Sequence, residues 1–175
     1  MKTVVIYRSQ TGFTKQYAQW IAEKTQADCF SFEVAKNKEF SGYDTIVFGG
    51  WFCAGGIQKL NWFKDRIFNW EGKKLVVFAV GGSPMESPDV DKTLHNIFTD
   101  EERAKVKAFY CPGGFRYDKM SASSRLLMKM FTKALKAKKD KTEEEINMAN
   151  MIGNSYDISD PKYITPIVTY INGDE

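Results

Sequence analysis

One short segment near the start of the chain constrains its fold more than any other. An apolar run ends in a loop of small polar residues that opens an amphipathic helix, so residues 2–8 predict a buried strand and residues 13–25 a helix. The loop between them carries three hydroxyl side chains, those of Ser9, Thr11 and Thr14. Gly12 lets the backbone approach a ligand closely. Because a helix N-terminus also presents free N–H groups and the positive end of a dipole, the segment predicts a phosphate-binding site.

The composition of this loop narrows the kind of phosphate ligand. The loop contains no lysine, and the chain lacks both the nucleotide pattern G-x-x-x-x-G-K-[ST] and the dinucleotide pattern G-x-G-x-x-G. Uncharged hydroxyl and amide groups suit a single phosphate monoester better than a triphosphate. The alternative is an ordinary strand-to-helix turn that is capped by Thr11.

Length and composition indicate a single globular domain. The chain has 175 residues, 43% apolar and 27% charged, which is enough to bury a core. The first strand begins directly after Met1, so we expect no signal peptide, and no apolar run reaches the ~18 residues of a membrane-spanning helix. The three cysteines, Cys29, Cys53 and Cys111, lack metal-ligand spacing. We therefore expect reduced thiols, no metal site and a cytoplasmic location.

The same alternation of strand and helix continues through the first 111 residues. Further strands are predicted at residues 29–34, 45–50, 74–80 and 105–111, and helices at 57–68, at 88–98 and, in a short form, after Thr99. Apolar strands that alternate with helices imply a parallel sheet covered on both faces. Three of the five strands end at Gly-Gly, which suggests bare backbone at the edge where open α/β sheets bind ligands. Tight turning alone is the alternative for these glycines.

Residues 5–21 resemble the flavodoxin signature, hydrophobic-hydrophobic-aromatic-x-Ser/Thr-x-x-Gly-x-Thr-x-x-x-Ala-x-x-hydrophobic. Every specified position is met, by Val5, Ile6, Tyr7, Ser9, Gly12, Thr14, Ala18 and Ile21. The resemblance implies a doubly wound five-stranded parallel sheet in the order 2-1-3-4-5, with helices on both faces, in one domain over residues 1–175. It also implies FMN as the cofactor. The phosphate of FMN would be held by the loop residues Ser9, Gln10, Thr11, Gly12, Phe13 and Thr14.

Two further loops are implied to contact the flavin ring. After the third strand, Gly50, Trp51, Phe52 and Cys53 place two aromatic side chains where one of them could stack on the ring. The sequence does not decide between Trp51 and Phe52, and packing on neighbouring protein is the alternative for both. After the fourth strand, backbone amides of Gly81, Gly82 and Ser83 could hydrogen-bond the polar edge of the flavin and tune its redox behaviour.

The chain is longer than a plain flavodoxin, in which the fifth strand is followed directly by the last helix. Residues 115–158 are therefore predicted to be a helical insertion, with helices at 121–137 and 143–152, before a last helix that Pro166 should kink or divide. Residues 115–141 hold nine basic and two acidic side chains, a net charge of +7, whereas the rest of the chain, with 16 and 20, carries −4.

The start of this insertion carries a second resemblance. Gly113 to Tyr117, continued by residues 124–130, are similar to a run in menaquinone-dependent protoporphyrinogen IX dehydrogenases, which are flavodoxin-like proteins with an insertion here. This implies an oxidoreductase that moves electrons from an organic substrate, such as protoporphyrinogen IX, to a quinone-like acceptor. Arg116 would be the candidate substrate contact, because a guanidinium pairs well with a carboxylate.

A non-enzymatic flavodoxin-type protein that transfers electrons between redox partners is the alternative function. Such carriers are usually strongly acidic, whereas this chain has a net charge of +3. A flavin-binding regulatory module without turnover is a third, weaker option. The electron donor, whether a small molecule or a redox protein, is not identified by the sequence.

The predicted helix at 121–137 has two chemically different sides. Its polar side covers an arc of about 100° and consists of Arg125, Lys129, Thr132, Lys133 and Lys136. Leucine, methionine, phenylalanine and alanine fill the rest. This pattern predicts a peripheral membrane contact through residues 121–139, at the inner face of the membrane. The alternative is a helix packed on the sheet with solvated lysines, and a nucleic-acid surface fits poorly because the basic side lacks stacking aromatics.

Overall fold

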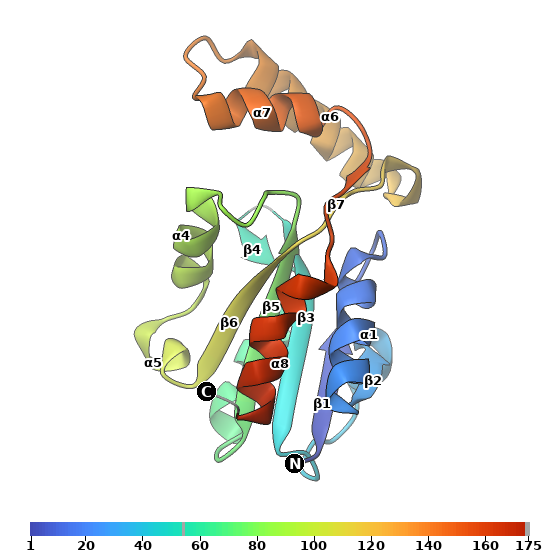
Figure 1. Cartoon of the computed structure of the whole chain (residues 1–175), viewed down its shortest axis with the longest axis vertical. Coiled ribbons are helices and arrows are strands. Elements are labelled where there is room, and N and C mark those ends of the chain that lie inside the picture. Colours follow the sequence, from blue (N-terminus) through green and yellow to red (C-terminus); the bar gives the residue numbers. More distant parts are fainter. Residues whose placement is uncertain (54, 174–175) are drawn as a thin grey trace.

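The computed structural model describes residues 1–53 and 55–173. Its centre is a parallel sheet (Figure 1) of β1 (Thr3–Tyr7), β2 (Asp28–Ser31), β3 (Thr45–Cys53), β5 (Lys74–Gly81) and β6 (Val106–Pro112). The strands lie in the order β2-β1-β3-β5-β6. A further short strand, β4 (Gly56–Ile57), pairs only with β3. Without it, the order is the predicted 2-1-3-4-5, and the doubly wound flavodoxin-like fold is confirmed.

Helices cover both faces of the sheet, because alternate strand residues point to opposite sides. The register partners Val5, Val47 and Val76 are buried with α1 (Phe13–Thr25) and α8 (Thr165–Asn172), which lie side by side in front of the sheet in Figure 1. Their neighbours Val4, Ile46 and Leu75 are buried on the other face. That face is covered by α2 (Phe32–Ala35), α3 (Leu60–Lys64), η1 (Ile67–Asn69), α4 (Pro88–Ile97) and α5 (Asp100–Arg103).

Two predicted elements have different bounds in the structure. The second strand ends at Ser31, because Phe32 turns inward as the first residue of the short helix α2. The predicted helix at 57–68 is broken into β4, α3 and η1, since residues 56–57 pair with β3 instead. β3 therefore continues beyond its glycines to Cys53, and Trp51 and Phe52 lie on a strand rather than in a loop.

The segment after β6 stands at the carboxyl ends of the strands, as Figure 1 shows. It consists of β7 (Gly114–Phe115), η2 (Tyr117–Lys119), α6 (Ala122–Ala137), α7 (Glu143–Met151) and β8 (Tyr156–Asp157). β7 and β8 pair antiparallel, so the insertion leaves and returns at one place. A small apolar cluster of Leu135, Ala149 and Ile152 joins its two helices.

The predicted starts of the inserted helices are confirmed by their caps. The Ser121 hydroxyl accepts a hydrogen bond from the Ser124 N–H at the start of α6, and Thr142 and Glu145 form a capping box at the start of α7. The last predicted helix is divided into η3 (Pro161–Ile164) and α8, with Pro166 in the first turn of α8. No helix within the described residues is both long enough and apolar enough to cross a membrane.

Candidate functional site

A cavity of about 870 Å³ lies between the carboxyl edge of the sheet and the insertion. Most of the residues predicted to contact a cofactor line it: Gln10, Thr11, Phe13, Thr14, Trp51, Phe52, Cys53, Gly81, Gly82 and Ser83. The structure thus brings together three segments whose residues are up to 73 positions apart in sequence. Four predicted residues are not among the lining residues, namely Ser9, Gly12, Gly50 and Arg116.

The loop before α1 ends at a helix N-terminus that no side chain caps among the described residues. Gly12 is the N-cap of α1 with a φ of 102°, a left-handed conformation that favours glycine. The Ser9 hydroxyl is used within the loop, where it accepts a 3.2 Å hydrogen bond from the Gly12 N–H. Within the described part of the chain no side chain caps α1, so Thr11 does not cap the turn. The first helical turn of α1 therefore has N–H groups without a side-chain acceptor among the described residues.

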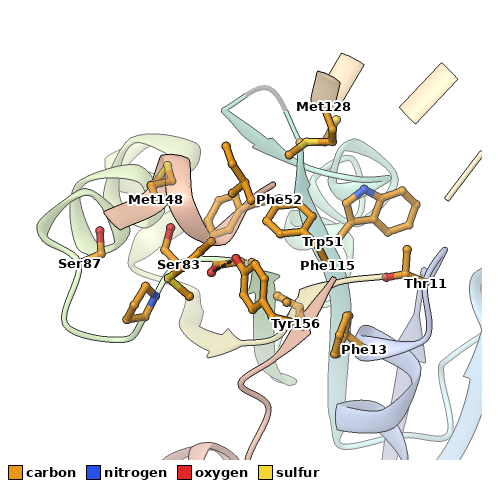
Figure 2. A pocket seen from close by; sticks show the side chains of 18 of the residues that line it. Thr11, Phe13, Trp51, Phe52, Ser83, Ser87, Phe115, Met128, Met148 and Tyr156 are labelled. Carbon is orange, nitrogen blue, oxygen red and sulfur yellow. Dashed lines mark hydrogen bonds between the residues drawn. The ribbon is translucent and has the colours of Figure 1, made fainter. Parts of the chain in front are cut away.

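Aromatic side chains form the middle of the cavity. Figure 2 shows Trp51, Phe52 and Phe115 between the roof residue Met128 and Phe13. The ring of Phe52 lies 5.9 Å from that of Tyr110 on β6, whereas the half-buried Trp51 indole has the guanidinium of Arg8 at 6.0 Å. Both predicted aromatics therefore reach the cavity, and Phe52 is also packed against the core.

The loop that follows β5 is held by two tyrosine hydroxyls. Tyr156 donates to the carbonyl oxygen of Gly82 at 2.6 Å, and Tyr110 donates to that of Ser83 at 2.8 Å. Burial raises the pKa of both tyrosines well above the ordinary range, so both hydroxyls stay protonated and keep donating. The loop carbonyls are thereby turned toward protein.

The glycine pairs are explained by packing of protein side chains. A Cβ on Gly49 would lie 2.0 Å from the ring of Phe78, and one on Gly50 would lie 2.6 Å from Ile57. On Gly82 it would lie 2.5 Å from Phe115. These glycines therefore admit neighbouring side chains to the edge of the sheet. Neither turning alone nor ligand approach is needed to account for them.

The roof of the cavity belongs to the insertion, but the residues that form it were not singled out from the sequence. It is formed by apolar side chains of the insertion, Met120, Leu127, Met128 and Phe131 from around α6 and Met148, Met151 and Ile152 from α7. Helical spacing alone could not distinguish such a face from an ordinary packing surface. Among the described lining residues Glu86 is the only one with a charged side chain, and none is lysine, arginine or histidine. The roof side of the cavity, away from the loop before α1, therefore suits an uncharged, apolar ligand better than an anionic one.

Arg116 lies beside the cavity, against the loop that precedes α1. Its guanidinium forms a 2.8 Å ion pair with Asp157, lies 4.1 Å from the ring centroid of Phe13 and donates a 3.4 Å hydrogen bond to the carbonyl oxygen of Thr11. Burial raises the pKa of Asp157, but hydrogen bonds from Ser159 and from Arg116 outweigh this and leave the pKa below its ordinary value. Asp157 is therefore ionised at neutral pH.

A second concave surface lies along α6, with a volume of about 660 Å³. Four basic side chains line it, Arg125, Lys129, Lys133 and Lys136, opposite residues 152–155. None of the four forms an ion pair within the described residues. Next to this basic groove, the apolar side chains of Leu126 and Met130 are 60% and 62% exposed.

Comparison with known proteins places the chain among flavodoxin domains. A family model described as a flavodoxin domain matches residues 4–142. The chain is similar to a solved flavodoxin, WrbA-like protein from Agrobacterium tumefaciens, with 19% identity, 87% of this chain and 97% of that chain covered and a TM-score of 0.48. It is also similar to a flavodoxin from the domain Archaea, with 15% identity, coverage of 88% and 100% and a TM-score of 0.40.

The chain is also similar to the solved structure of a flavoprotein in complex with FMN from Lactobacillus acidophilus. The identity is 16%, the match covers 62% of this chain and 90% of that chain, and the TM-score is 0.44. No curated protein matches the chain.

Proposed function

The chain belongs to the flavodoxin-domain family. From this premise we propose that it is an FMN-binding oxidoreductase, in which the insertion forms an apolar substrate-binding part of the cavity above the flavin site. The observation that carries the proposal is the single cavity shared by the loop before α1, the edge of the sheet and the roof formed by α6 and α7. When bound there, FMN would supply the hydride and electron transfer, and the protein would supply binding and orientation.

The donor groups present fit FMN at both of its ends. At the phosphate end, the uncapped N-terminus of α1, the left-handed Gly12 and the hydroxyls of Thr11 and Thr14 would hold a phosphate monoester. At the ring end, Trp51 and Phe52 offer flat apolar surfaces for the isoalloxazine. The backbone of Gly81 to Ser83 would meet its polar edge, where hydrogen bonds influence the redox potential.

We assign the apolar roof to a flat, uncharged electron acceptor of the quinone type. Met128, Phe131 and Met148 provide thioether and aromatic surfaces that adapt to a planar ring and exclude water from it. A substrate with carboxylates, such as protoporphyrinogen IX, is less favoured, because none of the described residues that line the cavity carries a positive charge.

We further propose that α6 contacts an anionic membrane surface. The basic groove lies beside the exposed Leu126 and Met130, an arrangement that suits headgroups and acyl chains together. Leu127 and Phe131, 53% and 48% exposed, also line the cavity. A lipid-dissolved acceptor could therefore enter along this face of the helix.

Cofactor binding is tested first. The purified protein is mixed with FMN, its visible spectrum is recorded, and the bound flavin is released and identified by chromatography. We expect a yellow protein that retains FMN. A protein that stays colourless with added FMN would contradict the whole proposal.

The acceptor chamber is tested with a matched pair of variants in α6. Met128→Lys places a charge in the roof, whereas Met130→Lys places the same charge on the outward, exposed face. The FMN-loaded proteins are reduced anaerobically with dithionite, and their reoxidation by menadione is followed by absorbance. We expect Met128→Lys to slow reoxidation by about tenfold or more, since a charge in the apolar roof opposes an uncharged ligand, and Met130→Lys to leave it unchanged. Equal rates in the two variants would place the acceptor elsewhere.

A further inference from the structure

Three consecutive residues of the loop before α1 are contacted by the insertion. The Gln10 side chain donates to the Ser121 hydroxyl at 3.3 Å and accepts from the Ser124 hydroxyl at 3.2 Å. Arg116 donates to the carbonyl oxygen of Thr11, and a Cβ on Gly12 would lie 3.1 Å from its Nη1 atom. The insertion thus holds the segment to which we assign the FMN phosphate.

The position of the Arg116 guanidinium is electrostatically unusual. It lies over the ring of Phe13, the first residue of α1, and so beside the positive end of the helix dipole. A cation is disfavoured at this end of a helix unless negative charge is nearby. Asp157 supplies one negative charge, at 2.8 Å, but its side chain is 45% exposed and lies on β8. An anion at the N-terminus of α1 would be stabilised by the helix and by Arg116 together.

The loop itself has no cation to offer a dianionic phosphate. Residues 9–14 contain no lysine or arginine, and the cavity lining described above contains no basic side chain. Arg116 brings a positive charge to this loop from the insertion. Its guanidinium bonds the Thr11 carbonyl, lies close to Gly12 and lies over the ring of Phe13. Its guanidinium is also fixed in orientation by Asp157, which limits the entropy lost when a ligand binds.

On the premise of the FMN site proposed above, we propose that Arg116 is a positioning residue for the cofactor phosphate rather than a substrate contact. Arg116 holds Thr11 and Gly12 in the phosphate-binding conformation and supplies the positive charge that the loop lacks. The insertion therefore contributes to selection of FMN over riboflavin, which has the same ring system without the phosphate.

The test compares the affinities of full-length variants for FMN and for riboflavin, each measured by the change in flavin fluorescence on binding. Arg116→Gln removes the charge, Arg116→Lys retains it, and Arg125→Gln removes an equal charge from the same insertion at a residue that lines the basic groove. We expect Arg116→Gln to weaken FMN binding by about tenfold or more, with riboflavin binding changed by less than about twofold. Arg116→Lys should recover part of the FMN affinity, and Arg125→Gln should bind both flavins as the unchanged protein does.

The outcomes separate this inference from the proposed function. If the unchanged protein binds neither flavin, the FMN site itself is wrong. If it binds FMN and Arg116→Gln weakens both flavins equally, Arg116 has only a structural role and the inference is overturned. Unchanged FMN affinity in Arg116→Gln would overturn it as well. A further check is salt, because added salt should weaken FMN binding less in Arg116→Gln than in the unchanged protein.

Discussion

The hydroxyl of Tyr156 donates a 2.6 Å hydrogen bond to the carbonyl oxygen of Gly82. This bond joins β8, by which the insertion returns, to the loop that follows β5. Phe115, on the paired strand β7, packs edge-on against Tyr156 with 5.4 Å between the ring centroids. The insertion and the edge of the sheet therefore form one packed unit around the cavity, so a change at their contact should affect both stability and ligand binding.

Gly82→Ala should destabilise this contact. The added methyl group would lie 2.5 Å from the Phe115 ring and 2.7 Å from the Tyr156 hydroxyl, so both side chains must shift. We expect a loss of about 1–3 kcal/mol in the free energy of unfolding, measured by urea titration, together with weaker FMN binding. Gly42→Ala is the matched control, since nothing lies within 4 Å of its added Cβ. A stable Gly82→Ala protein would show that the insertion separates from the sheet at low cost.

Trp51→Ala should mainly weaken FMN binding, whereas Phe52→Ala should mainly lower the stability of the fold. The ring of Phe52 packs against Tyr110 and the core, whereas no aromatic ring of the described residues packs against the Trp51 indole, so we expect Trp51 to be the residue that stacks on the flavin. We expect Trp51→Ala to weaken FMN binding by about tenfold with little change in melting temperature. Phe52→Ala should lower the unfolding free energy by roughly 1–3 kcal/mol. If the affinity effects are reversed, Phe52 is the stacking residue.

Glu102 should make stability depend on pH in the acid range. Its carboxylate forms a 2.8 Å ion pair with Lys64 and accepts a 2.8 Å hydrogen bond from the Thr99 N–H. Burial raises the pKa of Glu102, but these hydrogen bonds outweigh it and lower the pKa below the ordinary value. Because the pKa of Glu102 is lower in the folded state than in the unfolded state, its carboxylate stabilises the folded protein at pH values above the unfolded pKa of about 4.3. This stabilisation is lost as the pH falls through the pKa of the folded state.

The corresponding experiment is urea unfolding of Glu102→Gln at pH 7, 5 and 3.5. We expect the variant to be about 1–3 kcal/mol less stable at pH 7 and the difference to shrink at the lowest pH. Glu101→Gln, at the exposed neighbouring position, should show no such difference at any of the three. A difference that is constant with pH would mean that packing rather than charge explains the effect of Glu102.

Binding to vesicles should depend on the basic groove. We expect flotation with anionic phospholipid vesicles and not with neutral ones, and expect the combined change of Arg125, Lys129, Lys133 and Lys136 to Gln to weaken binding at least about tenfold. The control variant loses the same number of positive charges away from the groove, by changing four exposed lysines to Gln: Lys24, Lys92, Lys105 and Lys107. Equal loss in both variants would indicate an effect of net charge, and no binding by the unchanged protein would remove the membrane proposal.

Most of the fold could be predicted because its determinants are local. The apolar runs at Val4–Ile6, Thr45–Phe48 and Leu75–Val80 are buried strands, and the capping patterns at Thr99 and Thr142 begin helices in the structure. The hairpin of β3 and β4 was missed, since pairing of Phe52 with Ile57 competes with a helical pattern that begins at the same residue. Tyr110 and Tyr156 were missed as cavity residues, because nothing nearby in sequence marks a tyrosine whose hydroxyl bonds a distant carbonyl.

The sequence by itself determined the doubly wound sheet and the presence of a basic helical insertion, and it predicted a phosphate site at residues 9–14. Each follows from periodicity, hydroxyl spacing or charge within a single short segment. Only the tertiary structure decided what the insertion does with that loop. It turned Leu127, Met128 and Phe131 of α6 toward the cavity, left the basic side in a separate groove, and placed Arg116 against Thr11, 105 positions away. Such contacts depend on how the chain returns through β7 and β8, and spacing along a sequence does not fix the direction of that return.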